Sequence, residues 1–502
     1  MLNKRNHHIG IPFLQALVLC IGLTFPLLSS AEIDYSFLDV KPGTEQITKD
    51  ILAGVSEQIK EAQKQHPDKK INVIYLSGPI TTGPDSIDDN IDKGVRATRM
   101  LESNPKKGEI NIVISPYMIM PELNPGKYDT RGIGFKYNFS DASKAIINGW
   151  ITGPEQDHKT FMKVWGDGVF ASGIIDEVVM RDHYETSVGA IIEMGLFVAY
   201  EKPISFYRPT NDKKSFKLER FNHPSVAAQF EHTVLKKEAT QKDVVEATKW
   251  ALQKQTRAMV VRPEFMEDIS RILKGSMTIP TSVIGFPKDK FSATEYVTAP
   301  TSEKLKDAIT AIDGALAAGA NAIELDMIID VPSIKRWSML KKDEPKAAID
   351  ELKNAKADID AVITTVKEYV KDKGIGVRTK VILETSQLTP KEIEMASKVV
   401  RATYALAVKT NTGYGPKRTD EEALRDLQIM RNVVGNMKLI KSSGGGDKYN
   451  AYARKLWANL QGTSGTPEIV RHSWGDLERY SKLSSEVKNR KRNNPGKPKG
   501  RY

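Results

Sequence analysis

The sequence predicts an α/β protein in two parts: a (β/α)8 TIM barrel in the C-terminal half, preceded by a small doubly wound parallel-sheet domain. In the C-terminal half, strand-like apolar runs such as 258–261 alternate with helix-periodic segments such as 390–401, which is typical of a parallel sheet. Charged residues follow several of these runs, as they do at the mouth of a barrel. We expect a signal peptide at 1–31, a helical or linker segment at 32–69, the small domain at 70–211, the barrel at 225–475 and a basic disordered tail at 481–502.

The first 31 residues have the pattern of a secretory signal. Lys4 and Arg5 precede a largely apolar run over 9–28, and the small residues 29–31 suit cleavage. We therefore expect a secreted or periplasmic protein, with an uncleaved membrane anchor as the alternative. Cys20 is the only cysteine and lies in this segment, so the mature protein would form no disulfide and no cysteine-based metal site.

The net charge of +11 is concentrated at the two ends of the chain. Residues 481–502 carry eight basic side chains against Glu486, and Lys4 and Arg5 add two more positive charges, which leaves about +2 for the rest. A folded body near neutrality does not indicate nucleic-acid binding. The tail is typical of disordered segments and could make weak contact with anionic lipid or nucleic acid.

The small domain is expected to contain three strands and one glycine-entered helix. Strand patterns occur at 71–80, 174–180 and 202–207, and the helix pattern covers 186–200. The first strand runs into a turn at Gly78 and Pro79. Such a turn commonly opens a ligand site at the carboxyl end of the strand, so Gly78 is a candidate binding residue.

Glu193 stands out on this helix, in a Gly-x-x-x-Glu-x-Gly pattern that begins at Gly189. A surface glutamate is the simpler explanation, but the stretch resembles the nucleoside 2-deoxyribosyltransferase family and its hydrolase relatives. The resemblance implies that Glu193 is a nucleophile on the anomeric carbon, that Tyr75 is the first-strand tyrosine and that Asp167 assists at the base or sugar. Ser187, six residues before Glu193, implies a 5-phosphorylated substrate, because a hydroxyl donates to a phosphate that a carboxylate would repel.

Two short strands of the barrel end in lysine. Lys409 ends the apolar run 404–408, and Lys441 follows Leu439 and Ile440. Two neighbouring ammonium groups lower each other's pKa, and a neutral amine can form a Schiff base with a carbonyl. Asp326, at the end of the run 322–326, could move the protons of the carbinolamine and enamine steps.

These motifs resemble the deoxyribose-phosphate aldolases, with matching pieces in order from about 230 to about 469. The pieces are 230–236, 282–287, 324–326, 380–385, the two lysine motifs and 462–464. The resemblance implies a (β/α)8 barrel that reversibly cleaves 2-deoxyribose 5-phosphate to glyceraldehyde 3-phosphate and acetaldehyde. It implies that Lys409 is the Schiff-base lysine, that Lys441 depresses its pKa, that Asp326 relays protons and that Lys380 is a further active-site lysine. No metal and no organic cofactor is implied.

Glycine-rich loops follow the last strands, where backbone N–H groups can approach a phosphate. The candidate phosphate-binding residues are Gly413, Gly444, Gly445, Gly462 and Ser464. Three positions depart from the family pattern: Asn411 replaces a serine, Asp447 an arginine and Glu231 an aspartate. Because Asp447 would repel a phosphate, phosphorylated and free sugars both remain candidate substrates.

Together the two resemblances suggest a two-step enzyme. The small domain would cleave the N-glycosidic bond of a deoxynucleoside or deoxynucleotide, and the barrel would cleave the released deoxyribose 5-phosphate. The alternatives are an aldolase with a non-catalytic nucleoside-binding domain, a nucleoside deoxyribosyltransferase, and a cationic envelope-associated binding protein. A homo-oligomer is also possible.

Overall fold

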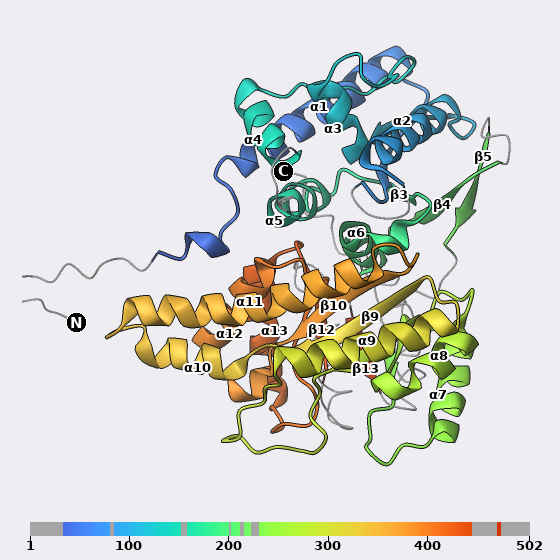
Figure 1. The fold of residues 1–502 in the computed structure, drawn as a ribbon. Coiled ribbons are helices and arrows are strands. Elements are labelled where there is room, and N and C mark those ends of the chain that lie inside the picture. The colour runs from blue at the N-terminus through green and yellow to red at the C-terminus, as the bar shows by residue number, and fades with distance from the viewer. Residues whose placement is uncertain are drawn as a thin grey trace, which may run out of the picture.

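The computed structural model describes residues 34–80, 85–151, 158–199, 202–210, 215–221, 230–443 and 469–472 (Figure 1). The expected signal peptide and basic tail lie outside the described residues, as do Gly444, Gly445, Asp447, Gly462 and Ser464. In the part of the chain that the structure describes, no helix is both long enough and apolar enough to cross a membrane.

The first unit is built on a five-stranded sheet in the order β2-β1-β3-β4-β5. Its strands are β1 (Lys70–Ser77), β2 (Glu109–Ile114), β3 (Glu177–Met180), β4 (Ile204–Pro209) and β5 (Phe216–Arg220). The first four run parallel, and β5 pairs antiparallel with β4. Because side chains alternate along a strand, Ile74 and Leu76 of β1 face one side of the sheet, and Val73 and Tyr75 face the other.

Helices cover both faces of this sheet, as the predicted doubly wound fold requires. Ala97 of α2 (Ile87–Ser103) packs with Ile74, whereas Ile51 of α1 (Thr44–Gln65) and Ile192 of α6 (Val188–Ala199) pack with Tyr75. The remaining helices of the unit are η1 (Ser36–Leu38), η2 (Pro116–Met118), α3 (Ile119–Leu123), α4 (Asp141–Ile151), α5 (His158–Met162), the π-helical η3 (Lys163–Phe170) and η4 (Tyr184–Thr186). Helix α1 belongs to this core, and β5 lies entirely after residue 211, so the unit is longer than the expected 70–211.

The second unit is a closed parallel barrel, which confirms the predicted TIM-barrel class. Its strands are β6 (Phe230–Thr233), β7 (Ala258–Val261), β8 (Ile279–Ile284), β9 (Ala322–Ile328), β10 (Gly376–Ile382), β11 (Ala407–Lys409), β12 (Leu439–Ser442) and β13 (Ile469–His472). Each strand pairs in parallel with the next, and β13 pairs with β6 to close the ring.

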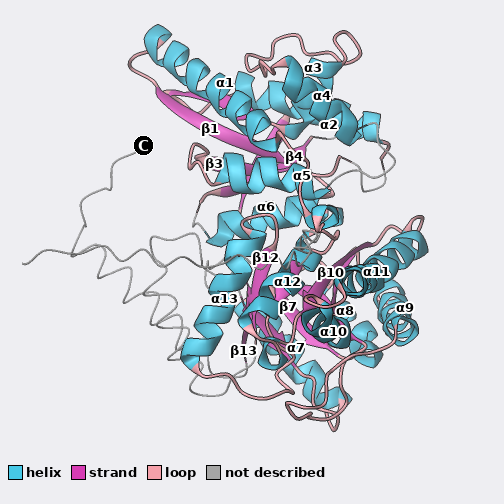
Figure 2. Ribbon diagram, turned by 90° about the vertical axis from the view of Figure 1, so that its left-hand side faces the viewer, coloured by secondary structure: helices cyan, strands magenta, loops and turns pink. Residues whose placement is uncertain are grey.

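Helices surround the barrel (Figure 2). They are α7 (Gln241–Lys254), η6 (Pro263–Phe265), α8 (Met266–Leu273), α9 (Thr301–Ala317), α10 (Val331–Leu340), α11 (Pro345–Val370), η7 (Thr385–Gln387), α12 (Pro390–Arg401) and α13 (Asp420–Val434). Three of these helices start at capping boxes, formed by Thr240, Thr389 and Thr419. In each box the threonine hydroxyl accepts from the backbone N–H three residues later, where an acidic residue reaches back, and such a cap is worth about 1 kcal/mol.

The first unit lies against the N-terminal ends of the barrel strands. On α6, Gly195 faces Leu439, the first residue of β12, and Gly376, the first residue of β10, faces the backbone of Glu185. Leu406, just before β11, belongs to the hydrophobic core of the first unit. The sheet unit therefore caps one end of the barrel, and the carboxyl ends of the barrel strands point away from it (Figures 1 and 2).

Candidate active site

The barrel brings the predicted lysines together on neighbouring strands. Lys409 and Lys441 are register partners across β11 and β12, and Lys380 stands opposite Asp326 across β10 and β9. All four side chains are buried in the barrel interior. The local cause is the period-two alternation of strands, which turns alternate residues toward the barrel axis.

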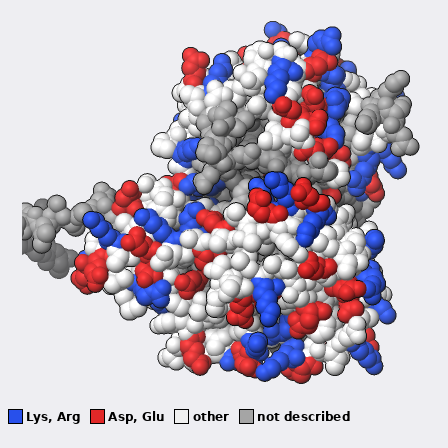
Figure 3. Space-filling model, viewed as in Figure 1, with Lys and Arg blue, Asp and Glu red and all other residues white. Residues whose placement is uncertain are grey.

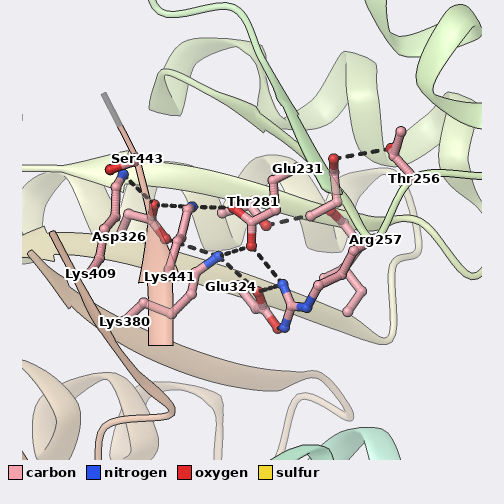
Figure 4. A network of polar contacts seen from close by, with 12 residues as sticks. Glu231, Thr256, Arg257, Thr281, Glu324, Asp326, Lys380, Lys409, Lys441 and Ser443 are labelled. Atoms are coloured by element: carbon pink, nitrogen blue, oxygen red, sulfur yellow. Dashed lines mark hydrogen bonds and ion pairs between the residues drawn. The ribbon is translucent and has the colours of Figure 1, made fainter. Parts of the chain in front are cut away.

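The four side chains meet at the carboxylate of Asp326 (Figure 4). Lys409 Nζ donates to Asp326 Oδ2 over 2.8 Å, and Lys441 Nζ donates to the same oxygen over 2.6 Å. Lys380 Nζ lies 3.0 Å from the other oxygen, Oδ1. Because both amines contact the same carboxylate oxygen, they lie next to each other. A lysine that forms a Schiff base needs such a second cation nearby, which lowers its pKa.

Two further carboxylates, Glu231 and Glu324, lie deeper in the barrel. Lys380 Nζ is 2.8 Å from Glu231 Oε1 and 2.9 Å from Glu324 Oε2, and Lys441 also donates to Glu231. In the sequence, Glu231 is visible only as a departure from a family pattern, and no role was predicted for Glu324. Glu324 precedes Asp326 by two residues on one strand, so alternation alone could have placed both on the inward face.

Two arginines extend this network to the floor of the barrel, and neither was singled out from the sequence. Arg257 donates to Glu231 over 2.6 Å and, through its two terminal nitrogens, to both oxygens of Glu324 over 2.8 and 2.7 Å. Arg378 Nε lies 3.4 Å from Glu324 Oε1. Five basic side chains therefore surround three carboxylates in a buried space, which favours release of a proton from one of the amines.

The surroundings separate the roles of two lysines. Burial lowers the pKa of Lys441, and its contacts with Asp326 and Glu231 offset this only in part. Burial acts on Lys380 in the same direction, but Asp326, Glu231 and Glu324 outweigh it and raise its pKa. Asp326 stays ionised, because Lys380, Lys409 and Lys441 outweigh burial and hold its pKa well below the ordinary value. Of these two lysines, Lys380 is therefore the one whose charge the carboxylates stabilise more strongly. The role that the resemblance implies for Lys441, lowering the pKa of Lys409, stays a prediction.

The loops after β11 and β12 are cross-linked next to the lysines. Ser443 N donates to Thr410 Oγ1 over 2.9 Å, and Thr410 Oγ1 donates to Ser443 O over 3.0 Å. Asn411 Oδ1 accepts from Ser386 N over 3.0 Å, so this departure from the family pattern ties the loops after β10 and β11 together. Gly413 is exposed and has φ +83°, a conformation that favours glycine.

The first unit contains a second candidate centre around Glu193. This carboxylate is only 3% exposed, so it is not the surface glutamate of the simpler explanation. Tyr75 Oη donates to Glu193 Oε1 over 2.8 Å, and Ser77, which was not predicted, donates to Oε2. Burial raises the pKa of Glu193 to about 7, against the two hydrogen bonds. At Gly78, a side chain would collide with the Tyr117 hydroxyl.

The other two residues predicted for this centre have different surroundings. Ser187 Oγ accepts from Ala190 N over 3.3 Å and so caps the start of α6. Asp167 lies at the contact with the barrel, where it accepts from Asn436 N over 2.5 Å and from Lys163 Nζ over 3.1 Å. No hydrogen bond joins Asp167 to Glu193 among the described residues. Asp167 was expected to act beside Glu193 on the base or sugar, and its observed position at the contact with the barrel differs from that expectation.

No family model matches this chain. The chain is 30% identical over 247 residues to the deoxyribose-phosphate aldolase of Malacoplasma penetrans, which covers 49% of this chain and 94% of that protein. It is 31% identical over 219 residues to the enzyme of the same name from Staphylococcus epidermidis, with 44% and 82% covered.

Two solved structures that match this chain are also described as deoxyribose-phosphate aldolases. A deoxyribose phosphate aldolase from Aeropyrum pernix is 24% identical with a TM-score of 0.36, and the match covers 52% of this chain and 92% of that one. A chain from Coccidioides immitis described as a deoxyribose-phosphate aldolase is 25% identical with a TM-score of 0.37, over 53% and 88%. On the sequence match to the curated relatives, which spans nearly their whole length, this chain is an enzyme of the deoxyribose-phosphate aldolase family.

Proposed function

We propose that the barrel is a Schiff-base aldolase that cleaves 2-deoxyribose 5-phosphate to glyceraldehyde 3-phosphate and acetaldehyde, with Lys409 as the reacting amine. The observation that carries this proposal is the pair of buried amines, Lys409 and Lys441, on a single oxygen of Asp326. The names of the relatives supply the substrate. Lys409 Nζ also lies 6.0 Å from the centre of the Phe286 ring, which gives it an apolar wall.

In the proposed reaction, neutral Lys409 adds to the aldehyde carbon C1, and loss of water gives an iminium ion. The C3 hydroxyl then loses its proton, the C2–C3 bond breaks, and its electron pair enters the iminium to form an enamine. Asp326 is the carboxylate in contact with Lys409 and would shuttle these protons. Protonation of the enamine and hydrolysis release acetaldehyde and restore the lysine.

The direct assay of this function is incubation of the full chain with 2-deoxyribose 5-phosphate. We expect acetaldehyde and glyceraldehyde 3-phosphate in equal amounts. Free 2-deoxyribose, run in parallel, would show whether the replacement of arginine by Asp447 has changed the preference for a phosphorylated sugar. Absence of acetaldehyde with both sugars would contradict the proposal and would favour a binding protein.

We propose a second activity for the first unit, the cleavage of the N-glycosidic bond of deoxynucleotides with Glu193 as nucleophile. The observation that favours it is a buried carboxylate held by Tyr75 and Ser77 near the carboxyl end of β1, the position of ligand sites in doubly wound sheets. Glu193 would form a glycosyl ester that water resolves, as in retaining glycosidases.

The pH profile of base release tests this second activity. Because the pKa of Glu193 is raised to about 7, its carboxylate is protonated at lower pH and cannot attack. We expect adenine release from deoxyadenosine monophosphate to rise with pH up to about 7 and then to level off, and Glu193→Gln to abolish it.

The matched control is Glu102→Gln, which removes another carboxylate of the first unit whose pKa burial raises, and it should keep both the rate and the profile. If the wild-type chain releases no adenine, the remaining interpretation is that the first unit binds nucleosides without cleaving them. Transfer of the sugar to an added free base would identify a transferase.

The arrangement of the two units bears on how the activities would be coupled. The first unit contacts the N-terminal ends of β10 and β12, whereas Lys409 is the last residue of β11. We infer that a sugar phosphate released by the first unit would reach the barrel through solvent, without a direct passage. Export to the periplasm or the medium remains a prediction from residues 1–31.

A further inference from the structure

A cavity of about 410 Å³ lies between the two units, at the end of the barrel opposite the proposed reaction. Helix α6 and the loop before it form one wall, and the ends of α8 and the starts of β8, β9 and β10 form the other. The volume is within the range of sites for small organic ligands.

Two buried side chains that line this cavity each carry a polar atom without a hydrogen-bond partner among the described residues. Arg378 is 1% exposed, and its Nη2 has no hydrogen-bond acceptor. Ser270 on α8 is also 1% exposed, and its Oγ has no partner. A buried donor without an acceptor is unfavourable, and more so when it is charged, so both groups would gain from an acceptor in the cavity.

The charge of the lining favours an anion. Arg208, Arg257, Lys274 and Arg378 line the cavity, against the acidic residues Asp182 and Glu185. Asp182 is already paired, because Arg181 Nε donates to it over 3.0 Å. Arg257 is likewise bonded to Glu231 and Glu324, and Arg208 lies 3.4 Å from Glu219. Among the described residues, Lys274 and the Nη2 of Arg378 remain to face an anion, and arginine presents a planar set of N–H donors that fits phosphate or carboxylate oxygens.

The rest of the lining is apolar. Ile191, Met194 and Val198 project from α6, and Leu273 and Met277 face them from the barrel. A free inorganic ion would leave this surface uncovered, whereas an organic anion could bury an apolar body there. The site thus combines donors for an anionic group with an apolar wall.

We propose that this cavity binds a small organic anion, a phosphate monoester with an apolar or aromatic body, through Arg378 and Ser270. The ligand would lie between the two units and bridge them. It would also contact the same guanidinium whose Nε lies 3.4 Å from Glu324, and Glu324 in turn pairs with Lys380 at 2.9 Å. The cavity and the lysine network therefore share two side chains, Arg378 and Arg257.

Calorimetric titration of the full chain with phenyl phosphate, inorganic phosphate and phenol tests the proposal. Phenyl phosphate should bind more tightly than inorganic phosphate, and phenol should bind weakest. Ser270→Ala should weaken phenyl phosphate binding about tenfold, the effect of one hydrogen bond to a charged group. Val198→Trp, which fills the cavity from α6, should abolish binding.

Ser397→Ala is the matched control, because Ser397 on α12 is a buried serine whose Oγ also lacks a partner among the described residues, and it does not line the cavity. It should bind phenyl phosphate as the wild type does. Binding that neither Ser270→Ala nor Val198→Trp affects would place the anion elsewhere, at the barrel mouth for example, and would overturn the proposal. Equal affinity for phenol and phenyl phosphate, or no binding of either by the wild type, would overturn it as well.

Discussion

Replacing Lys409 with methionine is expected to reduce the cleavage of 2-deoxyribose 5-phosphate by at least about 1,000-fold, since removal of a covalent nucleophile leaves only binding and orientation. Methionine keeps the length of the side chain and removes the amine. Lys409 is buried and its Nζ donates to Asp326 over 2.8 Å, so the loss would follow from chemistry at this position. The measurement is the initial rate of acetaldehyde formation.

Lys438→Met is the control for this experiment. Lys438 is also buried in the barrel, and burial lowers its pKa to about 7, but its Nζ donates to the carbonyls of Thr403 and Ala405 over 2.7 Å each. It lies outside the Asp326 cluster and should not be needed for the reaction. A Lys409→Met protein that retains most of its activity, or a loss of activity in Lys438→Met alone, would contradict the assignment.

Replacing Lys380 with methionine is expected to give the largest loss of stability. Its Nζ lies within 3.0 Å of Glu231, Glu324 and Asp326, and all four side chains are fully buried. Removing one partner of a buried ion cluster costs about 3–5 kcal/mol, because the remaining charges stay buried without compensation. The measurement is the free energy of unfolding in urea at neutral pH.

The control is Lys391→Met, at an exposed ion pair with Glu394 in which the two side chains are 59% and 31% exposed. This change should alter the free energy of unfolding by less than about 1 kcal/mol. Equal effects of the two substitutions would show that Lys380 does not hold the three carboxylates together in the folded protein.

Much of the barrel could be predicted from local patterns. The strand expected at 258–261 and the helix expected at 390–401 have the observed bounds, since an apolar run and a capping box mark them in the sequence. Lys409, Lys441 and Asp326 were predicted because each ends a short apolar run in the sequence, whereas Lys380 was predicted from the family resemblance alone. Ser77 was missed because a serine at the end of a strand has no distinctive pattern.

The charged cluster near the N-terminal ends of the barrel strands could not be predicted in this way. Arg257 precedes β7 and Arg378 lies within β10, and their shared partner Glu324 becomes visible only when the strands are placed in register. The setting of Asp167 depends on the contact between the two units, where Gly435 lacks a side chain that would collide with its carboxylate. Contacts between units are not encoded in the local periodicity of the sequence. The charged cluster and the partners of Asp167 therefore became visible only in the structure.

Whether Lys409 is the Schiff-base lysine is tested most sharply by mass spectrometry of the full chain after incubation with acetaldehyde and borohydride. We expect a single reduced ethyl adduct on the peptide that contains Lys409, because this amine is held beside a second amine on Asp326. An unmodified Lys409, or an adduct on Lys438 or on exposed lysines alone, would contradict it.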